Sequence, residues 1–274
     1  MNVIHTKLNI GATKPFKIVH VSDTHFTYAD DRDDERKIAM AGRRRKVFPD
    51  SEKVLAEAVR VSKELSCPII HTGDLSDFVS VANLEAVRKF LAENDCFFVA
   101  GNHEFARYIA EADENAEYRN LSLATVQAAF TNDIRMASRV INGVNFVALD
   151  DGYYLIEPEQ MEFLKNEVEK GLPIVLMMHV PLFEQNFFDD IMPNRSSAHM
   201  LAVPKELMAN YDRGTYYDQL ADDLTYEAWE YITSQPNIKA ILTGHLHFNY
   251  ECMIKDRLPQ ILTGMRDVRV VEIE

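Results

Sequence analysis

Five apolar segments of the sequence each end in side chains that bind metal ions. Imidazole, carboxylate and amide groups together are typical ligands of borderline divalent ions such as Mn, Fe, Zn or Ni. Calcium sites use oxygen ligands almost alone, so they fit this mixture poorly. Seven such side chains exceed what one ion with an open position needs, and they predict two ions that share a carboxylate. The seven candidates are Asp23, His25, Asp74, Asn102, His179, His245 and His247.

The order of these groups is more specific than any one of them. An Asp-x-His motif or a Gly-Asp pair is common by chance, and a lone histidine such as His179 is more often a hydrogen-bonded core residue. The glycines before Asp74 and Asn102 allow the backbone to turn tightly, so that short side chains can enter a crowded site. His245 and His247 lie two residues apart and point the same way in an extended chain. All five groups in this order indicate one shared site.

The elements that carry these groups alternate between strands and helices. Short apolar runs predict strands buried on both faces at 16–21, 68–70, 96–100, 144–149, 173–178 and 238–242. Helical spacing predicts helices within 54–65, 84–91, 161–168 and 224–232, the third preceded by Pro158. Such alternation predicts an α/β domain. Ligands bind at the carboxyl edge of sheets of this class, which is where the five groups lie.

The remaining segments are less regular. The tail predicts three short strands, at 248–254, 260–263 and 268–273, which we expect to form an antiparallel meander. Two stretches, near 27–49 and 181–223, lack clear periodicity, and we interpret them as irregular insertions that serve as functional loops. We expect residues 1–274 to form a single domain that contains both insertions.

The five groups, in this order, resemble the calcineurin-like metallophosphoesterase superfamily over residues 23–247. The resemblance implies a four-layer αββα sandwich, in which two mixed β-sheets are flanked by helices. It also implies that Asp23, His25 and His247 hold the first ion, and that Asp74 bridges the two ions. The second ion would be held by Asn102, His179 and His245.

The resemblance also implies a mechanism. Two ions would share a hydroxide, which attacks a phosphate ester in line. His103 would lie over the substrate and protonate the leaving oxygen or stabilise charge in the transition state. Asp77, three residues after Asp74, matches an aspartate that orients this histidine in the protein phosphatase branch. A helix N-cap for the segment from Phe78 is the alternative role of Asp77.

Several other residues are candidates for substrate contacts. We expect Asn102, His103, Arg195 and Tyr153 to contact the substrate, with packing as the alternative role of the tyrosine. Among the remaining histidines, His20 and His71 lie within predicted strands. His199 is predicted to be a surface residue, with a substrate contact as its alternative role. The basic run at 43–46 follows an acidic run at 30–35, which favours a solvated, internally paired loop over a phosphate-binding surface.

The composition of the chain indicates which substrates and which cellular compartment to expect. The chain has 274 residues, of which 47% are hydrophobic, so it can form a sizeable core. Its net charge of −14 disfavours nucleic acid as a partner. Its three cysteines form no CxxC motif, which fits a reducing compartment. No apolar segment is long enough for a signal peptide or a membrane span, so we expect a cytoplasmic protein without membrane contact. The sequence carries no signal for its oligomeric state.

Within the superfamily, Phe78 distinguishes this chain from the protein phosphatases, which have an arginine at that position. The segment Gly-Asp-Leu-Ser-Asp more closely resembles small bacterial phosphodiesterases. We therefore predict a metal-dependent phosphoesterase acting on a small molecule, and we favour a phosphodiester over a monoester. A nuclease of the same superfamily and a non-catalytic scaffold are the alternatives, although a scaffold would have lost some of the ligands that are all present here.

Overall fold

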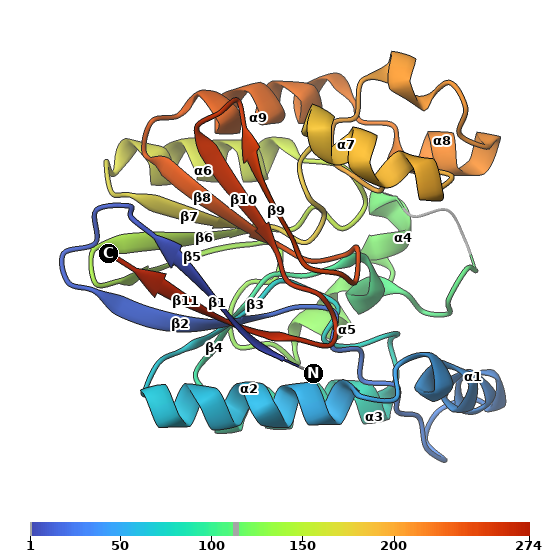
Figure 1. Cartoon of the computed structure of the whole chain (residues 1–274). Coiled ribbons are helices and arrows are strands. Elements are labelled where there is room, and N and C mark those ends of the chain that lie inside the picture. The colour runs from blue at the N-terminus through green and yellow to red at the C-terminus, as the bar shows by residue number, and fades with distance from the viewer. Residues whose placement is uncertain (1, 112–114) are drawn as a thin grey trace.

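Two mixed β-sheets form the centre of the computed structural model, which describes residues 2–111 and 115–274 (Figure 1). The first sheet has the strand order β1-β11-β2-β3-β4, and the second has the order β5-β6-β7-β8-β10-β9. The strands are β1 (Val3–Leu8), β2 (Phe16–Val21), β3 (Ile69–His71), β4 (Cys96–Phe98), β5 (Met136–Ile141), β6 (Val144–Leu149), β7 (Ile174–Met177), β8 (Ile238–Thr243), β9 (Tyr250–Ile254), β10 (Leu258–Leu262) and β11 (Val268–Ile273).

The sheets pack face to face and helices cover both outer faces. Buried side chains from both sheets, including Ile18, Phe97, Phe146 and Val175, form the layer between them. The helices are α1 (Glu35–Val47), α2 (Ser51–Leu65), α3 (Val81–Glu93), α4 (Ala116–Asn120), α5 (Leu123–Gln127), α6 (Pro158–Glu169), α7 (Gln185–Ile191), α8 (Arg213–Gln219) and α9 (Asp223–Ser234).

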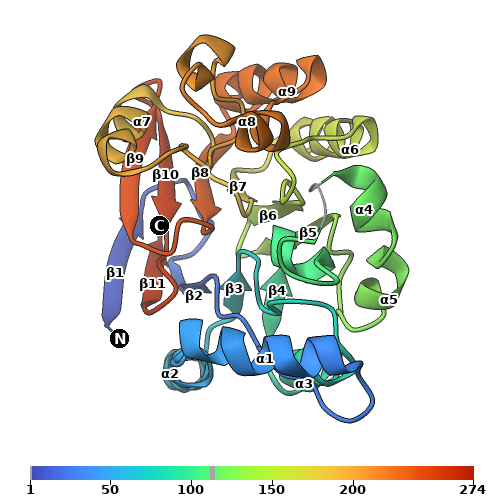
Figure 2. The same cartoon turned by 90° about the vertical axis from the view of Figure 1, so that its right-hand side faces the viewer.

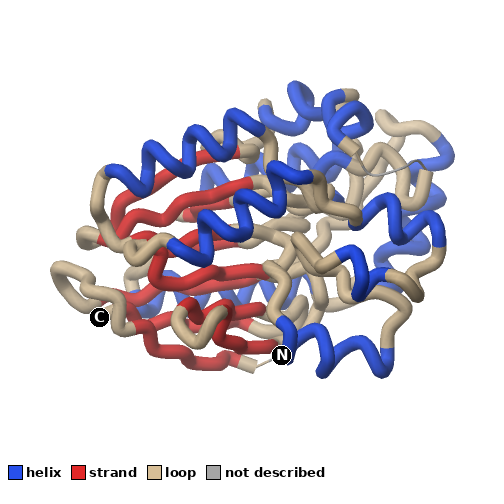
Figure 3. The backbone as a smooth tube through the Cα atoms, turned by 90° about the horizontal axis from the view of Figure 1, so that it is seen from above, coloured by secondary structure: helices blue, strands red, loops and turns tan. Residues whose placement is uncertain are grey.

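The amphipathic helices explain the outer layers. Apolar residues of α2 and α3 pack on the first sheet, and those of α6 and α9 pack on the second. Seen from above, helices overlie the strands along their length (Figure 3). The predicted four-layer αββα sandwich is therefore confirmed, as are the strands and helices predicted in its core. Pro158 occupies the first turn of α6, as expected. Among the described residues, no helix has the length and apolar character needed to cross a membrane.

The predicted topology is wrong mainly in the C-terminal segment, residues 248–273. Strands β9 and β10 pair antiparallel, as expected, but β10 also pairs in parallel with β8. The last strand does not continue this meander. It crosses to the first sheet, where it pairs in parallel with β1 and antiparallel with β2. Hydrophobic alternation identifies a strand but does not say which sheet it joins.

Parts of the two stretches without clear periodicity are helical. Residues 35–47 form α1, in which only Met40 and Ala41 are buried, so the apolar stripe is too narrow to show in the sequence. The second stretch contains α7, α8 and two 3₁₀ turns, at Met192–Asn194 and Lys205–Met208. Strands β1 and β5 were also missed, because both lie at sheet edges and have few fully buried residues.

Candidate metal centre

The predicted ligands follow the carboxyl ends of strands from both sheets. Figure 2 labels the strands that carry them, β2, β3, β4, β7 and β8. In the first sheet, Asp23 and His25 follow β2, Asp74 follows β3, and Asn102 opens a 3₁₀ turn after β4. In the second sheet, His179 follows β7, while His245 and His247 follow β8. Strands β2, β3 and β4 are parallel neighbours, and so are β7 and β8, so their ends lie along one edge of the sandwich.

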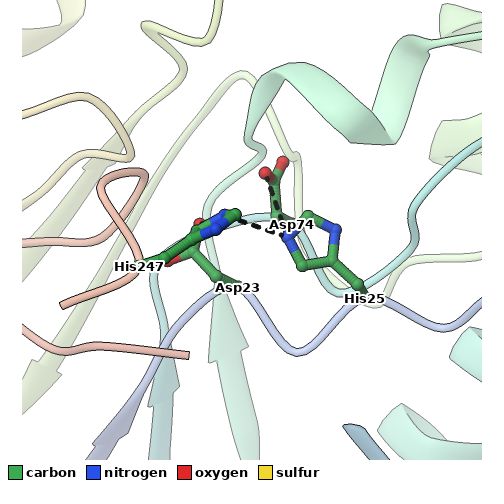
Figure 4. A group of neighbouring side chains, drawn as sticks. All are labelled: Asp23, His25, Asp74 and His247. Atoms are coloured by element: carbon green, nitrogen blue, oxygen red, sulfur yellow. Dashed lines mark hydrogen bonds and ion pairs between the residues drawn. The ribbon is translucent and has the colours of Figure 1, made fainter. Parts of the chain in front are cut away.

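One group of ligands is formed by Asp23, His25, Asp74 and His247. Each offers one ligand atom, and these atoms all lie within 4.8 Å of one another. His25 Nε2 is 3.4 Å from His247 Nε2 and 3.7 Å from Asp74 Oδ2. His247 Nε2 lies 3.4 Å from Asp23 Oδ1. Figure 4 shows the two imidazoles turned toward each other, with the carboxylates beside them. The group has the composition and size of a site for one divalent ion.

A second group adjoins the first through Asp74. His179 Nε2 lies 3.3 Å from Asp74 Oδ2, the same oxygen that faces His25. His245 Nδ1 is 3.1 Å from His179 Nε2. Asn102 lines the same cavity as Asp74 and His245. The Asp74 carboxylate therefore lies between the two groups, where a bridging ligand would be needed.

The outward nitrogen of three of the four imidazoles has a neighbour close by, which leaves the other nitrogen directed at the cluster. His179 Nδ1 bonds the Thr72 carbonyl oxygen at 2.7 Å, and His245 Nε2 bonds the Tyr154 hydroxyl at 2.8 Å. His25 Nδ1 lies 3.1 Å from Asp77 Oδ1. Partners of this kind fix the tautomer and orientation of metal-binding histidines. The donor set therefore fits two divalent ions.

The charges of the cluster also favour cations. Burial lowers the pKa of His179, but the Asp74 and Asp23 carboxylates outweigh it and raise that pKa well above its usual value. Burial raises the pKa of Asp23, but the hydrogen bond with His247 and the charges of His247 and His179 together outweigh burial and lower that pKa. Burial depresses the pKa of His245 well below its usual value. Two buried carboxylates thus create a demand for positive charge that bound metal ions would satisfy.

The backbone at the ligands is strained. Asp23, His25, Asp74, His245 and His247 all have φ angles between 45° and 67°. Residues with a Cβ avoid this left-handed region, at a cost of about 1–3 kcal/mol each, and such strain concentrates at functional sites. The surrounding sheets must supply the stability that holds five such residues in place.

Close packing explains the glycines beside the ligands. A Cβ at Gly101 would lie 2.3 Å from Asp74 Oδ1, and one at Gly73 would lie 2.5 Å from His179 Nδ1. A Cβ at Gly244 would lie 2.4 Å from Asp23 Oδ2. Gly73, with a φ of 94°, makes the expected tight turn, whereas Gly101 has an extended backbone with a φ of −105°, so close approach of the ligands is the reason for glycine there.

We expect Gly101→Ala to lower both the metal content and the free energy of unfolding, the latter by about 1–3 kcal/mol, because the new methyl group overlaps Asp74. Denaturant unfolding and metal analysis check this. Gly42→Ala is the control. No atom lies within 4 Å of its new Cβ, and it should stabilise α1 by about 0.5–1 kcal/mol. Equal stability of the two variants would contradict the packing explanation.

Two buried carboxylates that position the ligand loops were not predicted. Glu104 accepts backbone N–H groups from Asp74, Ser76 and Gly101 at 2.7–2.9 Å, and burial raises its pKa to about 8. Asp151 accepts the backbone N–H of His179 at 2.8 Å, and burial raises its pKa to about 7. The sequence held one signal for Glu104, its place in the motif Gly-Asn-His-Glu. A buried glutamate needs hydrogen-bond donors, and the backbone N–H groups of the ligand loops supply them.

The predicted catalytic pair is in contact. His103 Nδ1 lies 3.2 Å from Asp77 Oδ1 and 2.9 Å from the Asp77 carbonyl oxygen. Burial lowers the pKa of His103, but the Asp74 and Asp77 carboxylates outweigh it and raise the pKa to about 10. Asp77 is not a helix N-cap, because α3 starts later and Ser80 caps it by accepting the Asn83 N–H. The same carboxylate binds Arg44, so the basic run does not lie wholly in solvent.

A cavity of about 450 Å³ opens onto the cluster. It is lined by Arg195, as expected for a substrate contact, together with Asn102 and His103. Tyr153 does not line it. That side chain is buried, with its hydroxyl 3.4 Å from the Asn102 carbonyl oxygen, and the neighbouring Tyr154 faces the cavity instead.

Two histidine predictions have different outcomes. His199 is not a free surface residue. Its Nδ1 lies 3.1 Å from the Tyr154 hydroxyl, and its ring lines the cavity. His20 and His71 are buried behind the ligands, as expected, and each bonds a threonine hydroxyl at 2.9 Å.

Comparisons with known proteins agree with this geometry. The family model described as calcineurin-like phosphoesterase matches residues 16–249. No curated protein matches the sequence significantly. The fold is similar to that of a dimetal phosphatase from Danio rerio, with a TM-score of 0.55, 14% identity, and coverage of 91% of this chain and 88% of that chain. It is also similar to the phosphopantetheinyl hydrolase of Mycobacterium tuberculosis, with a TM-score of 0.50, 14% identity, and coverage of 91% and 90%. The chain therefore belongs to the calcineurin-like phosphoesterase family and is a metal-dependent hydrolase of phosphate esters.

Proposed function

We propose that the protein hydrolyses a small-molecule phosphodiester at a centre for two divalent ions. Asp23, His25 and His247 would hold one ion, and Asp74 would be shared with the other. The ligands of the second ion are Asn102, His179 and His245. The observation that carries the proposal is the position of the Asp74 carboxylate, which has an oxygen 3.7 Å from one ligand group and 3.3 Å from the other.

Each protein group has a separate task in this reaction. When bound, the two ions supply a water nucleophile active at neutral pH and offset charge on the phosphoryl group. His103 lines the cavity beside the cluster and donates a proton to the leaving oxygen. Asp77 holds the imidazole of His103 through Nδ1. Arg195 and Asn102 orient the phosphoryl oxygens from the cavity wall.

Phe78 supports a diester over a monoester. This side chain is fully buried against Met40 and Ala41, so it offers nothing to a phosphate where the protein phosphatases place an arginine. A monoester dianion needs more positive charge than a diester monoanion, and the missing guanidinium favours the diester. The adjoining cavity has room for a second ester substituent.

The surface charge supports a small molecule over nucleic acid. The net charge is −14, and Arg44 of the basic run is paired with buried Asp77. A nuclease needs several cations along a groove to bind phosphates.

Turnover of para-nitrophenyl phosphate and bis(para-nitrophenyl) phosphate, with Mn, Fe, Zn or Ni added, tests the proposal. We expect the diester to have the higher kcat/KM in at least one metal form. A consistent preference for the monoester would reject the diester assignment but leave the metal centre intact. Strongly salt-sensitive binding and cleavage of single-stranded DNA would instead favour a nuclease.

The cavity contact of Arg195 predicts a loss of substrate binding. We expect Arg195→Ala to reduce kcat/KM for the diester roughly 10- to 100-fold, because a hydrogen bond to a charged group is worth about 1.5–3 kcal/mol. Steady-state kinetics measures this. Arg213→Ala, an exposed arginine of α8 that does not line the cavity, is the control. Equal kinetics of both variants would remove Arg195 from the substrate site.

A further inference from the structure

Arg44 of α1 makes a two-point contact with the Asp77 carboxylate. Its Nε donates to Asp77 Oδ2 at 2.7 Å, and its Nη2 donates to Asp77 Oδ1 at 2.9 Å. The Asp77 side chain is fully buried, whereas that of Arg44 is 20% exposed. Parallel contacts of this kind are among the strongest and most directional hydrogen bonds in proteins.

The same carboxylate faces two imidazoles of the active centre. Asp77 Oδ1 lies 3.2 Å from His103 Nδ1 and 3.1 Å from His25 Nδ1. One oxygen therefore contacts Arg44, His103 and His25, and the other oxygen is held by Arg44 alone. The guanidinium fixes the carboxylate plane, and the plane in turn sets where the two rings point.

The helix that carries Arg44 also contacts the centre through its C-terminal end. Phe48, four residues after Arg44, caps α1 and stacks on the His25 ring with a centroid distance of 3.8 Å and an interplanar angle of 13°. The Arg44 guanidinium carbon lies 4.9 Å from the centre of the Phe48 ring. Met40 and Ala41 anchor the helix against Phe78. In Figure 2, α1 lies below β3 and β4, in front of α2 and α3.

We propose that Arg44 is a positioning residue for catalysis: it fixes the Asp77 carboxylate, which holds His103 in the orientation needed to protonate the leaving group. The proposal rests on the role of His103 given above. It assigns a function to the segment that carries α1. The positive charge of Arg44 is paired with Asp77 inside the protein, so this arginine is not assigned to phosphate binding.

The geometry explains why arginine is needed. A lysine at this position would supply the charge as a single point, without the planar pair of N–H groups that matches a carboxylate. Without any cation, the buried carboxylate would keep only its contacts with the imidazoles, and its plane would be free to rotate. His103 Nδ1 would then lose a fixed contact with the carboxylate and keep only its 2.9 Å contact with the Asp77 carbonyl oxygen, while the backbone N–H of His103 would still bind Asp74 Oδ1.

A leaving-group comparison tests the proposal. The test compares a phenyl ester with the matching para-nitrophenyl ester, both diesters or both monoesters. Phenolate is the poorer leaving group, so its departure depends more on protonation by His103. We expect Arg44→Ala to lower kcat for the phenyl ester about 10- to 100-fold, and for the para-nitrophenyl ester clearly less. KM should change little. The assays contain excess metal ion, because Asp77 also contacts the metal ligand His25 and a weaker hold on that ring must not limit turnover. Arg44→Lys should be intermediate.

The matched control is Arg43→Ala, an exposed arginine one residue earlier in the same helix, which should match wild type. Adding Arg44→Ala to His103→Ala should cause no further loss, because both act through the same proton transfer. Equal losses for both esters, or a further loss in the double variant, would overturn the proposal. If Arg44→Ala does not fold, Arg44→Lys decides. A larger loss of kcat for its phenyl ester than for its para-nitrophenyl ester supports the proposal, and equal losses overturn it. If His103→Ala itself shows no ester dependence, the role of His103 fails instead.

Discussion

Asp74→Asn is expected to reduce kcat more than about 100-fold in every metal form, and to lower the bound metal from two ions per chain toward one. Loss of a residue that only supports a ligand already costs about 10- to 100-fold, and Asp74 is proposed as a direct ligand of both ions. The amide keeps the shape of the side chain but removes the charge and one acceptor oxygen. Steady-state kinetics and metal analysis of the purified protein measure both effects.

The control is Asp256→Asn. Asp256 has a φ of 52°, close to the 58° of Asp74, but it is an exposed turn residue between β9 and β10. The two variants therefore make the same chemical change at the same kind of backbone position. Near-normal turnover with two bound ions in Asp74→Asn would remove the bridging role. Loss of activity in Asp256→Asn as well would point to folding rather than to metal binding.

The ligand set was predictable because the fold itself brings it together. Parallel neighbouring strands end at the same edge, so residues after β2, β3, β4, β7 and β8 must lie close to one another wherever the two sheets are packed. The buried strands that carry them read as apolar runs in the sequence. The position of strand ends does not predict which residues of the surrounding helices and loops will contact the site.

Arg44 shows this limit. It lies in a basic run on a mostly exposed helix, and the acidic run before it offers nearby partners in the sequence. The structure gives one of these acidic residues, Asp34, to the N-cap of α1, while Arg44 turns inward to Asp77. A carboxylate that is buried beside two imidazoles is a stronger partner than an exposed one, but burial is not visible in a charge pattern.

The cavity wall shows a second limit. Tyr153 and Tyr154 are adjacent and chemically identical, and only the backbone decides which one faces the cavity. Tyr154 has a φ of 60°, an unfavourable value for this residue type, which no sequence pattern predicts. That turn brings the Tyr154 hydroxyl to His245 and His199, and leaves Tyr153 packed in the core.

His103→Ala is expected to lower kcat about 10²- to 10⁴-fold, the range of general acid catalysis, and to do so most for esters with poor leaving groups. Metal content should stay at the wild-type level. The Asp74 contact is made by the backbone N–H of residue 103, which alanine retains, and the imidazole Nδ1 faces Asp77 rather than the metal ligands.

His5→Ala, at an exposed position of β1, controls for the loss of a histidine as such. The comparison separates the two roles that a partly buried histidine beside a metal centre can have. If His103 only shaped the site, its removal would affect phenyl and para-nitrophenyl esters alike and would reduce the metal content. If it supplies the proton, the para-nitrophenyl ester should retain much of its turnover, because para-nitrophenolate departs without protonation. An equal loss for both esters with normal metal content would assign His103 to charge stabilisation in the transition state, and the proton donor would have to be another group lining the cavity.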